Sequence, residues 1–198
     1  MKHIHSKVLP FIGIDINDIN RFIHNNNKHL IQLYTDSFLL LKEKQIPFVI
    51  FSNEETELEK DFSSNISKYF NLQKDYQIKE EQIIFNHTPM KELAQKYKNN
   101  IVLITGLGNI EAIAKSYMFK NFITGLEYAD LFPIQVPNRM WSFTADELNK
   151  RLNEARTKVE KRLGIKIDKF LKIQSVISLT SDMEWQDLNL VCIYNINK

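Results

Sequence analysis

Short apolar runs alternate with amphipathic helical segments along the chain as far as residue 124. The apolar runs are residues 8–16, 46–52, 82–85, 100–105 and 121–124, and the helical segments are residues 28–44, 54–70, 88–97 and 110–119. Apolar runs of this length, bounded by turn residues, are typical of buried strands, and the segments between them carry apolar residues at helical spacing. The alternation predicts an α/β fold with a largely parallel sheet.

The pattern changes after residue 132. Two prolines follow in a stretch without clear periodicity, and then residues 144–164 form the strongest helical pattern in the chain. Thr144 and Glu147 have the spacing of a capping box, and Gly164 marks the end of the helix. A strand is predicted over 173–180 and a short helix over 184–196. We therefore place a domain boundary between residues 132 and 133, which divides the chain into 1–132 and 133–198.

Composition excludes several classes of protein. The 198 residues carry a net charge of +2, which favours neither a nucleic-acid-binding nor a strongly acidic protein. Cys192 is the single cysteine, so an internal disulfide is excluded and a reducing compartment is expected. No apolar run approaches the length of about 20 residues that a membrane span requires. The histidines show no ligand spacing, so we expect no metal site from these residues.

The first candidate site is "FIGIDINDIN", residues 11–20, where a strand ends in polar residues. Asp15 and Asn17 are two residues apart, so in a strand their side chains share one face. An aspartate at the carboxyl end of a strand in an α/β sheet can act as a nucleophile. The alternative is an Asx turn that ends the strand, in which Asn17 and its neighbours bond the local backbone. Both interpretations stay open on these residues alone.

Two further strand ends carry candidate residues. Ser52 and Asn53 follow the second strand, where a hydroxyl and an amide can bind a phosphate oxygen or cap the next helix. Gly106 and Gly108 form half of a dinucleotide-binding fingerprint, but the position of its third glycine is occupied by Glu111. An acidic residue there would repel a pyrophosphate, so a tight strand-to-helix turn is the favoured interpretation.

The segment from residue 150 to residue 172 is basic, because it contains nine lysines and arginines but only three acidic residues. The candidates for a docking face are Arg151, Arg156, Lys158 and Arg162. Such a face can bind an acidic protein, RNA or lipid headgroups. Aromatic residues for base stacking are nearly absent from this segment, which makes RNA the less favoured ligand of such a face. The alternative is a solvated helix face.

Taken in order, these segments resemble the haloacid dehalogenase superfamily. "FIGIDINDIN" resembles the first motif, a strand that ends in Asp-x-Asp-Gly, and "IPFVIFSN" resembles the second, a strand that ends in Ser or Thr before Asn. "HTPM", the Gly-x-Gly turn and "SDMEWQDLNLV" are similar to segments of the capped phosphatase branch, and in particular of its mitochondrial cat-eye-syndrome-critical-region-like group. The resemblance implies a partial Rossmann-like core in residues 1–132, leading into an incomplete cap region in 133–198.

The departures from this resemblance bear on function. Asp15 matches the family's nucleophile, and Ser52 is intact. Asn17, however, stands where the family has an acid that protonates the leaving group, and an amide cannot act as that general acid. Asp18 stands where the family has glycine. The family's later lysine and acidic magnesium motif follow the cap, and the sequence ends at Lys198 before them. The resemblance is therefore to a degenerate and truncated member.

These departures lead us to expect a non-catalytic structural or interaction subunit of a large protein complex, with no cofactor. The resembled group implies a mitochondrial setting, and the cytoplasm is the alternative. We also expect a partner, such as a separately encoded second half, because the apolar first strand would otherwise keep an uncovered flank. The alternative function is a Mg²⁺-dependent phosphatase, which would use Asp15 and Ser52 and be completed by a second chain.

Overall fold

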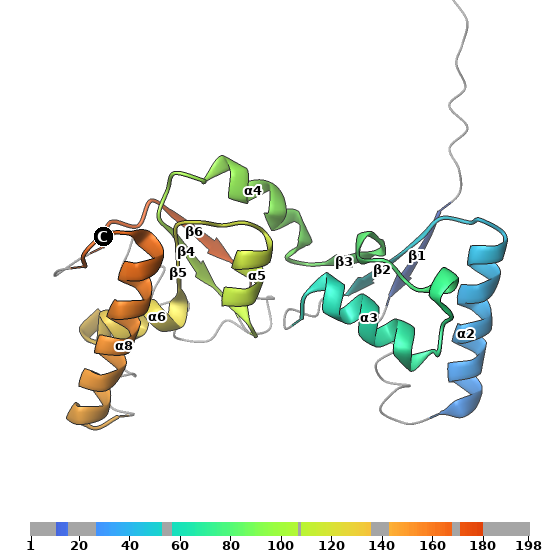
Figure 1. Cartoon of the computed structure of the whole chain (residues 1–198), viewed down its shortest axis with the longest axis horizontal. Coiled ribbons are helices and arrows are strands. Elements are labelled where there is room, and N and C mark those ends of the chain that lie inside the picture. Colours follow the sequence, from blue (N-terminus) through green and yellow to red (C-terminus); the bar gives the residue numbers. More distant parts are fainter. Residues whose placement is uncertain are drawn as a thin grey trace, which may run out of the picture. The chain divides into compact units, whose positions relative to one another are not determined.

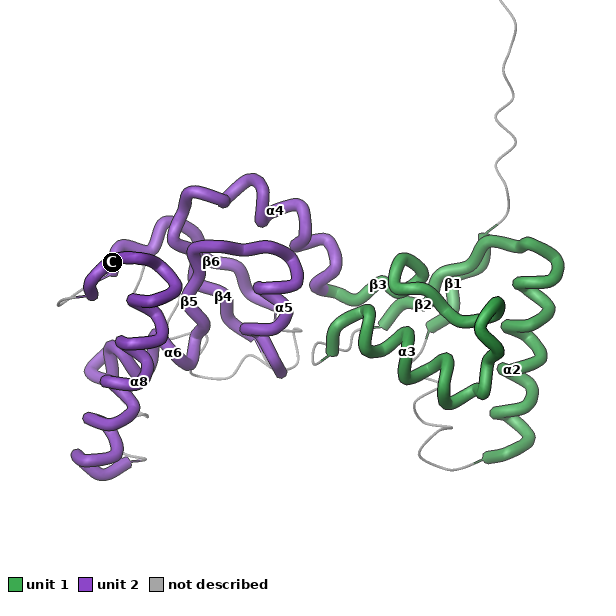
Figure 2. The backbone as a smooth tube through the Cα atoms, in the orientation of Figure 1, with its two compact units in different colours: residues 1–86 green, residues 87–198 purple. Residues whose placement is uncertain are grey.

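A computed structural model gives the fold, and it describes residues 11–15, 27–52, 57–106, 108–135, 143–167 and 171–179. The chain divides into two compact units, residues 1–86 and 87–198, which Figure 2 draws in different colours. Within the described residues, each unit is built around its own parallel sheet of three strands. The predicted α/β class with parallel sheets is confirmed.

The first unit alternates strands and helices. Its sheet contains β1 (Ile12–Asp15), β2 (Phe48–Ser52) and β3 (Ile83–Phe85), in the order β1-β2-β3. The helix α2 (Lys28–Glu43) connects β1 to β2, and α3 (Glu59–Tyr69) follows β2 (Figure 1). Two 3₁₀ turns, η1 (Lys74–Tyr76) and η2 (Glu80–Gln82), lead from α3 to β3.

Both described helices of the first unit pack on one face of its sheet. The two connections run in the same direction across the sheet, and right-handed crossovers in one direction place their helices on one side. The shared core is accordingly built from Phe38 of α2, Phe62 and Ile66 of α3, and the strand residues Phe48 and Ile50. The rings of Phe38 and Phe48 lie with centroids 5.7 Å apart. We call this side of the sheet the inner face.

The opposite side, which we call the outer face, presents Gly13, Asp15, Val49, Phe51 and Ile84. These residues alternate with the buried ones along each strand, and the strand register places Asp15 beside Phe51 and Phe51 beside Ile84. Phe51 is 43% exposed and Ile84 is 41% exposed, whereas their neighbours Ile50 and Phe85 are buried. No described helix covers this face.

The first strand differs from its prediction. We expected an apolar strand buried on both faces, but Ile12 is 40% exposed and the preceding Phe11 is 65% exposed. The prediction of burial is wrong for the described residues. The reason is topological, since β1 lies at the edge of the described sheet and no described strand covers its other flank.

The second unit begins with a 3₁₀ turn, η3 (Thr88–Met90), and the short helix α4 (Lys91–Lys96), which together replace the single helix predicted over 88–97. Its sheet contains β4 (Val102–Thr105), β5 (Phe122–Thr124) and β6 (Ser175–Ser178) in the order β5-β4-β6. The remaining described elements are the helices α5 (Ile110–Ser116), α6 (Gly125–Leu131) and α8 (Ala145–Leu163), and the 3₁₀ turn η4 (Pro133–Gln135).

The sheet of the second unit is covered on both sides. Ala155 and Val159 of α8 pack with Ala129 of α6 against Leu103 and Ile123. On the other side, α5 lies against the strand residues that alternate with these, such as Ile104 and Ile177. The crossover from β4 to β5 and the crossover from β5 to β6 run in opposite directions across the sheet, so their helices fall on opposite faces.

The long helix α8 confirms its prediction. Thr144 caps it with the predicted Glu147 in a capping box, and it ends at Gly164, whose φ of 67° is the left-handed conformation that glycine adopts readily. Ala155 and Val159 of the predicted apolar stripe are buried.

The units are divided at a different place from the predicted boundary. The chain passes from the first unit to the second between residues 86 and 87, so the boundary placed after residue 132 lies within the second unit. The physical reason is that β4, β5 and α6 share one hydrophobic core with α8. The strand predicted over 173–180 is found as β6, and the helix predicted over 184–196 lies outside the described residues. Among the described helices, none combines the length and apolarity that a membrane span would need.

Candidate functional site

Two candidate residues lie at the carboxyl edge of the first unit's sheet. Asp15 is the last residue of β1, and Ser52 is the last residue of β2. The strands are parallel neighbours, and Asp15 pairs with Phe51, so Ser52 lies one residue further along. Asp15 is exposed and Ser52 is buried, with 4% of its surface exposed. The structure therefore brings both residues to the edge where α/β sheets bind ligands.

The companion residues of this edge lie outside the described residues. Asn17 and Asp18 follow β1, and Asn53 follows β2, so the structure does not place any of the three. Within the described ranges, no group of three or more His, Cys, Asp or Glu side chains is arranged to hold a metal ion.

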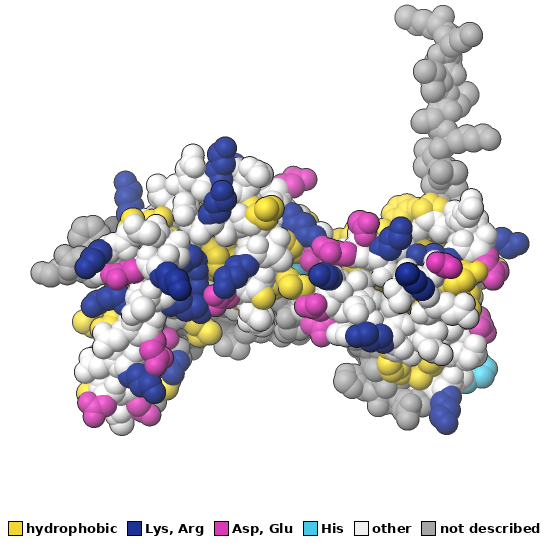
Figure 3. Space-filling model, viewed as in Figure 1, with side chains coloured by type: hydrophobic (Ala, Val, Ile, Leu, Met, Phe, Trp, Pro, Cys, Tyr) yellow, Lys and Arg dark blue, Asp and Glu magenta, His cyan; other side chains and the backbone are white. Residues whose placement is uncertain are grey.

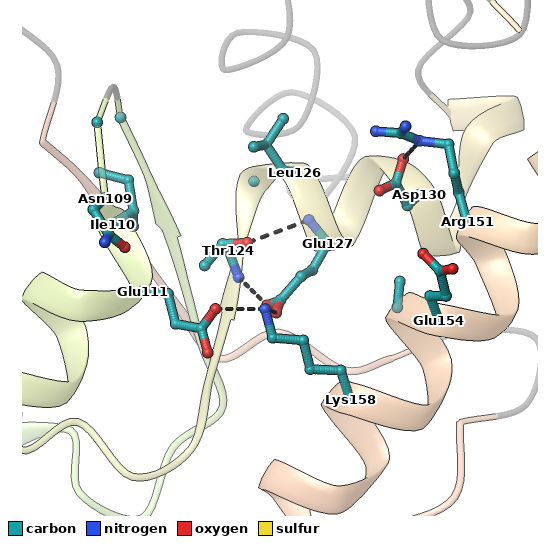
Figure 4. Close-up of a pocket in the computed structure, with 14 residues that line it drawn as sticks. Asn109, Ile110, Glu111, Thr124, Leu126, Glu127, Asp130, Arg151, Glu154 and Lys158 are labelled. Atoms are coloured by element: carbon teal, nitrogen blue, oxygen red, sulfur yellow. Dashed lines mark hydrogen bonds and ion pairs between the residues drawn. The ribbon is translucent and has the colours of Figure 1, made fainter.

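A cavity of about 520 Å³ opens at the carboxyl edge of the second unit's sheet. It is lined by the turn after β4, the start of α6 and one side of α8 (Figure 4). The charged residues that line it are Glu111, Glu127, Asp130, Arg151, Glu154 and Lys158. Its volume falls in the range of small-molecule sites, about 300–1,000 Å³.

Ion pairs hold most of these charges. Arg162 of α8 donates to both carboxylate oxygens of Glu127, each at 2.8 Å, and to Glu111 at 3.2 Å. Lys158 donates to Glu111 and lies 3.2 Å from Glu127. Lys115 pairs with Glu111 at 2.7 Å. We call these five residues the charge network, and it links α8 to α5 and α6.

The charge network fixes the ionisation of its members. Partial burial raises the pKa of Glu111, but hydrogen bonds from Lys115 and Lys158 outweigh it and hold that pKa at about 2. The pKa of Glu127 is likewise lowered, because Arg162 and the backbone N–H of Thr124 outweigh the effect of burial. Hydrogen bonding to Glu111 raises the pKa of Lys158. Both carboxylates and the lysine therefore stay charged at neutral pH, and Lys158 cannot serve as a neutral amine nucleophile.

The glycines beside this cavity form the tight strand-to-helix turn that the sequence favours. A Cβ at Gly106 would lie 2.9 Å from the Ile110 side chain and 3.0 Å from the Leu179 side chain, so packing requires glycine there. Gly108 has a φ of 76°, which favours glycine. Glu111 and Glu127 both line the cavity that a pyrophosphate would have to enter. The geometry favours a tight turn over a dinucleotide site.

The proposed docking cations are largely engaged within the second unit. Arg162 and Lys158 belong to the charge network, and Arg151 pairs with Asp130 at 3.2 Å and stacks on Phe143. Arg156 has no ion pair among the described residues. On the side drawn in Figure 3, basic and acidic side chains are intermixed over α8. Reversing the charge of Arg151 and Lys158 would therefore break internal ion pairs as well as test docking.

One feature of the second unit was missed by the sequence analysis, although a signal for it exists. Thr124 and Glu127 form a capping box that starts α6, with the Glu127 carboxylate accepting from the Thr124 N–H at 3.0 Å. The Thr-x-x-Glu spacing is the sequence signature of a helix start. By contrast, the pairing of Glu127 with Arg162 joins residues 35 apart and leaves no local signal.

A comparison with known protein families agrees with the fold. Residues 17–120 match the family model described as haloacid dehalogenase-like hydrolase, a range that includes Ser52 and begins two residues after Asp15. No curated protein matches the chain.

Four solved chains match, and one of them is a Bacillus subtilis protein described as a "putative p-nitrophenyl phosphatase". It is 14% identical, with a TM-score of 0.48, and the match covers 94% of this chain and 65% of that one. The family match extends over more than half of the sequence, and the parallel strands and their connecting helices agree with it. The chain belongs to the haloacid dehalogenase-like hydrolases.

Proposed function

We propose that the chain is a non-catalytic member of this family that serves as a structural or interaction subunit of a larger protein complex. The observation that carries the proposal is the exposed outer face of the first unit, together with the edge of β1 with which no described strand pairs. Parallel sheets are normally buried on both faces, because their crossover helices cover them. A face that exposes Phe51, Ile84 and the adjoining Phe11 is therefore a surface for another polypeptide.

The sequence at the catalytic edge supports the non-catalytic half of the proposal. Asn17 replaces the acid that protonates the leaving group in the resembled mechanism. General acid catalysis typically contributes about 10²–10⁴-fold to a rate, so its loss removes most turnover even where the nucleophile is kept. The resemblance to the capped branch and its mitochondrial group is the basis for proposing a mitochondrial complex.

A second candidate function is a Mg²⁺-dependent phosphatase completed by another chain. The specific observation that favours it is that Asp15 and Ser52 end neighbouring parallel strands, as a nucleophile and a phosphate-binding hydroxyl would. Magnesium in such a site would neutralise charge on the phosphoryl group. An RNA-binding role for α8 is less favoured, because Arg151, Lys158 and Arg162 already have carboxylate partners.

An activity assay separates the two functions. We expect the purified chain, with magnesium and p-nitrophenyl phosphate, to show no turnover above that of its Asp15→Asn variant. The isosteric variant removes the nucleophile and keeps the size of the side chain, so it is the matched background. Turnover by the native chain that disappears in Asp15→Asn would contradict the non-catalytic proposal and favour the phosphatase.

A further inference from the structure

We propose that the cavity of the second unit binds a small zwitterion, an α-amino acid with an apolar side chain. This inference goes beyond the proposed function and does not depend on whether the first unit is catalytic. Every described residue that lines the cavity belongs to the second unit. Three features carry the inference: the place of the cavity in the sheet, two charged side chains at its wall, and its apolar lining.

The cavity lies where the connections of the second sheet diverge. The strands β4 and β5 are parallel neighbours. The chain leaves β4 for α5 on one face of the sheet and leaves β5 for α6 on the other. Neighbouring strands of this kind form a crevice at their carboxyl ends, and open α/β sheets bind ligands in that crevice. Gly106 and Asn109, after β4, and Thr124 and Gly125, after β5, line the cavity from both sides of the crevice.

The charges around the cavity balance, and this balance favours a neutral ligand. Among the described residues, the lining and the charge network together hold four carboxylates and four cations, namely Glu111, Glu127, Asp130 and Glu154, and Lys115, Arg151, Lys158 and Arg162. A polyphosphate or a metal ion would leave a large uncompensated charge there. A ligand that carries one positive and one negative group keeps the balance.

Two charged side chains at the wall have binding capacity left. Glu154 makes no ion pair or hydrogen bond within the part of the chain that the structure describes. Its side chain points from α8 toward α6 (Figure 4). Arg151 donates to Asp130 through its Nε–H at 3.2 Å, so its two terminal amino groups have no partner among the described residues. The wall therefore offers one carboxylate and one guanidinium to a ligand.

The spacing of these two side chains suits an α-amino acid. Arg151 and Glu154 are three residues apart on α8, so their Cβ atoms are about 5–6 Å apart on one side of the helix. The bond to Asp130 and the stacking on Phe143, at 4.4 Å from the ring centroid, orient the guanidinium. The ammonium and the carboxylate of an α-amino acid share one carbon. One ligand can therefore donate to Glu154 and accept from the arginine fork.

Apolar side chains select the rest of the ligand. Ile110, Ala155 and Leu126 line the cavity beside the charged groups. Leu126 is 57% exposed, so its side chain gains from being covered by apolar atoms of a ligand. An amino acid with an apolar side chain would supply them, and a polar side chain would not.

The test is isothermal titration calorimetry of the purified full chain with leucine, isoleucine, methionine and phenylalanine as probes. The tightest binder is then compared with the amine that lacks its carboxylate and with the acid that lacks its ammonium. Each analogue has lost one charged hydrogen-bonding group, so we expect each to bind about tenfold more weakly. Hydrogen exchange of the α6 and α8 amides should slow in the presence of the amino acid, because a bound ligand stabilises the folded unit.

Two variants separate the two contacts. Glu154→Gln should lower the affinity about tenfold and remove the advantage of the amino acid over the analogue that lacks the ammonium. Arg151→Gln should instead remove its advantage over the analogue that lacks the carboxylate. Asp146→Asn is the matched control, since Asp146 is an exposed acid of the same helix outside the cavity lining, and it should leave the affinity unchanged. Circular dichroism checks that all variants are folded.

Three results would overturn the proposal. The first is that none of the four amino acids binds at millimolar concentrations. The second is that either analogue binds as tightly as the amino acid. The third is that Glu154→Gln lowers the affinity no more than Asp146→Asn does. Asp15-dependent turnover would instead contradict the non-catalytic role, so the two failures are distinguishable.

Discussion

Replacement of Phe48 by alanine is expected to lower the free energy of unfolding of the first unit by about 3–5 kcal/mol. Phe51→Ala, three residues along the same strand, is expected to lower it by about 1 kcal/mol or less. Phe48 is buried and packs on Phe38 of α2, so its removal leaves a cavity in the core. Phe51 points to the outer face and is 43% exposed, so its removal leaves none.

The two variants form a matched pair, because residue type, strand and backbone geometry are the same. Urea unfolding followed by hydrogen exchange of the β2 and β3 amides measures the stability of the first unit separately from that of the second. Equal losses for the two variants would mean that the outer face is packed as well as the inner one. The description of the sheet as covered on one side only would then be wrong.

Arg162→Ala is expected to lower the free energy of unfolding of the second unit by up to about 3–5 kcal/mol, because it removes the bidentate partner of the buried Glu127 carboxylate and leaves Lys158 as its remaining cation. The Arg162 side chain is 11% exposed and that of Glu127 is 8% exposed. The arginine also donates to the Phe122 carbonyl at 3.1 Å, stacks over the Phe122 ring and thereby covers the free edge of β5. Its loss removes the strongest link between α8 and the start of α6.

Arg151→Ala is the control for this prediction. Arg151 lies on the same helix and makes one ion pair with Asp130, but its side chain is 38% exposed. An exposed pair of this kind contributes about 0–1 kcal/mol. Arg162→Lys should recover part of the stability, because it restores the charge without the two-pronged geometry that matches a carboxylate. If Arg162→Ala lowered the free energy of unfolding no more than Arg151→Ala in denaturant unfolding, the charge network would contribute no more than an exposed ion pair.

The elements that the sequence predicts well are those whose signals are local. Helix α8 has its capping box, its apolar stripe and its terminal glycine within one continuous segment, and all three are found. The strands β2 and β4 are short apolar runs that any parallel sheet would bury, and each pairs with strands on both sides.

The features that sequence analysis did not predict depend on distant residues. The run that contains β1 is as apolar as that of β2, but β1 lies at a sheet edge and its burial depends on what lies beside it. The cations of α8 appear as a docking face in the sequence, because their acidic partners lie on α5 and α6. Lys158 and Glu111 are 47 residues apart, and no spacing rule connects them.

The most direct measurement of the central claim is size-exclusion chromatography of the purified chain at several concentrations, combined with a thermal melt at each. Covering apolar surface stabilises by roughly 25 cal/mol per Å², so an exposed patch of a few hundred Å² contributes several kcal/mol when it is buried. We predict that the chain alone self-associates or is poorly soluble, that its melt shifts with concentration, and that Phe51→Ser reduces both effects. A clean monomer with a sharp, concentration-independent melt would contradict the claim that the first unit requires a partner.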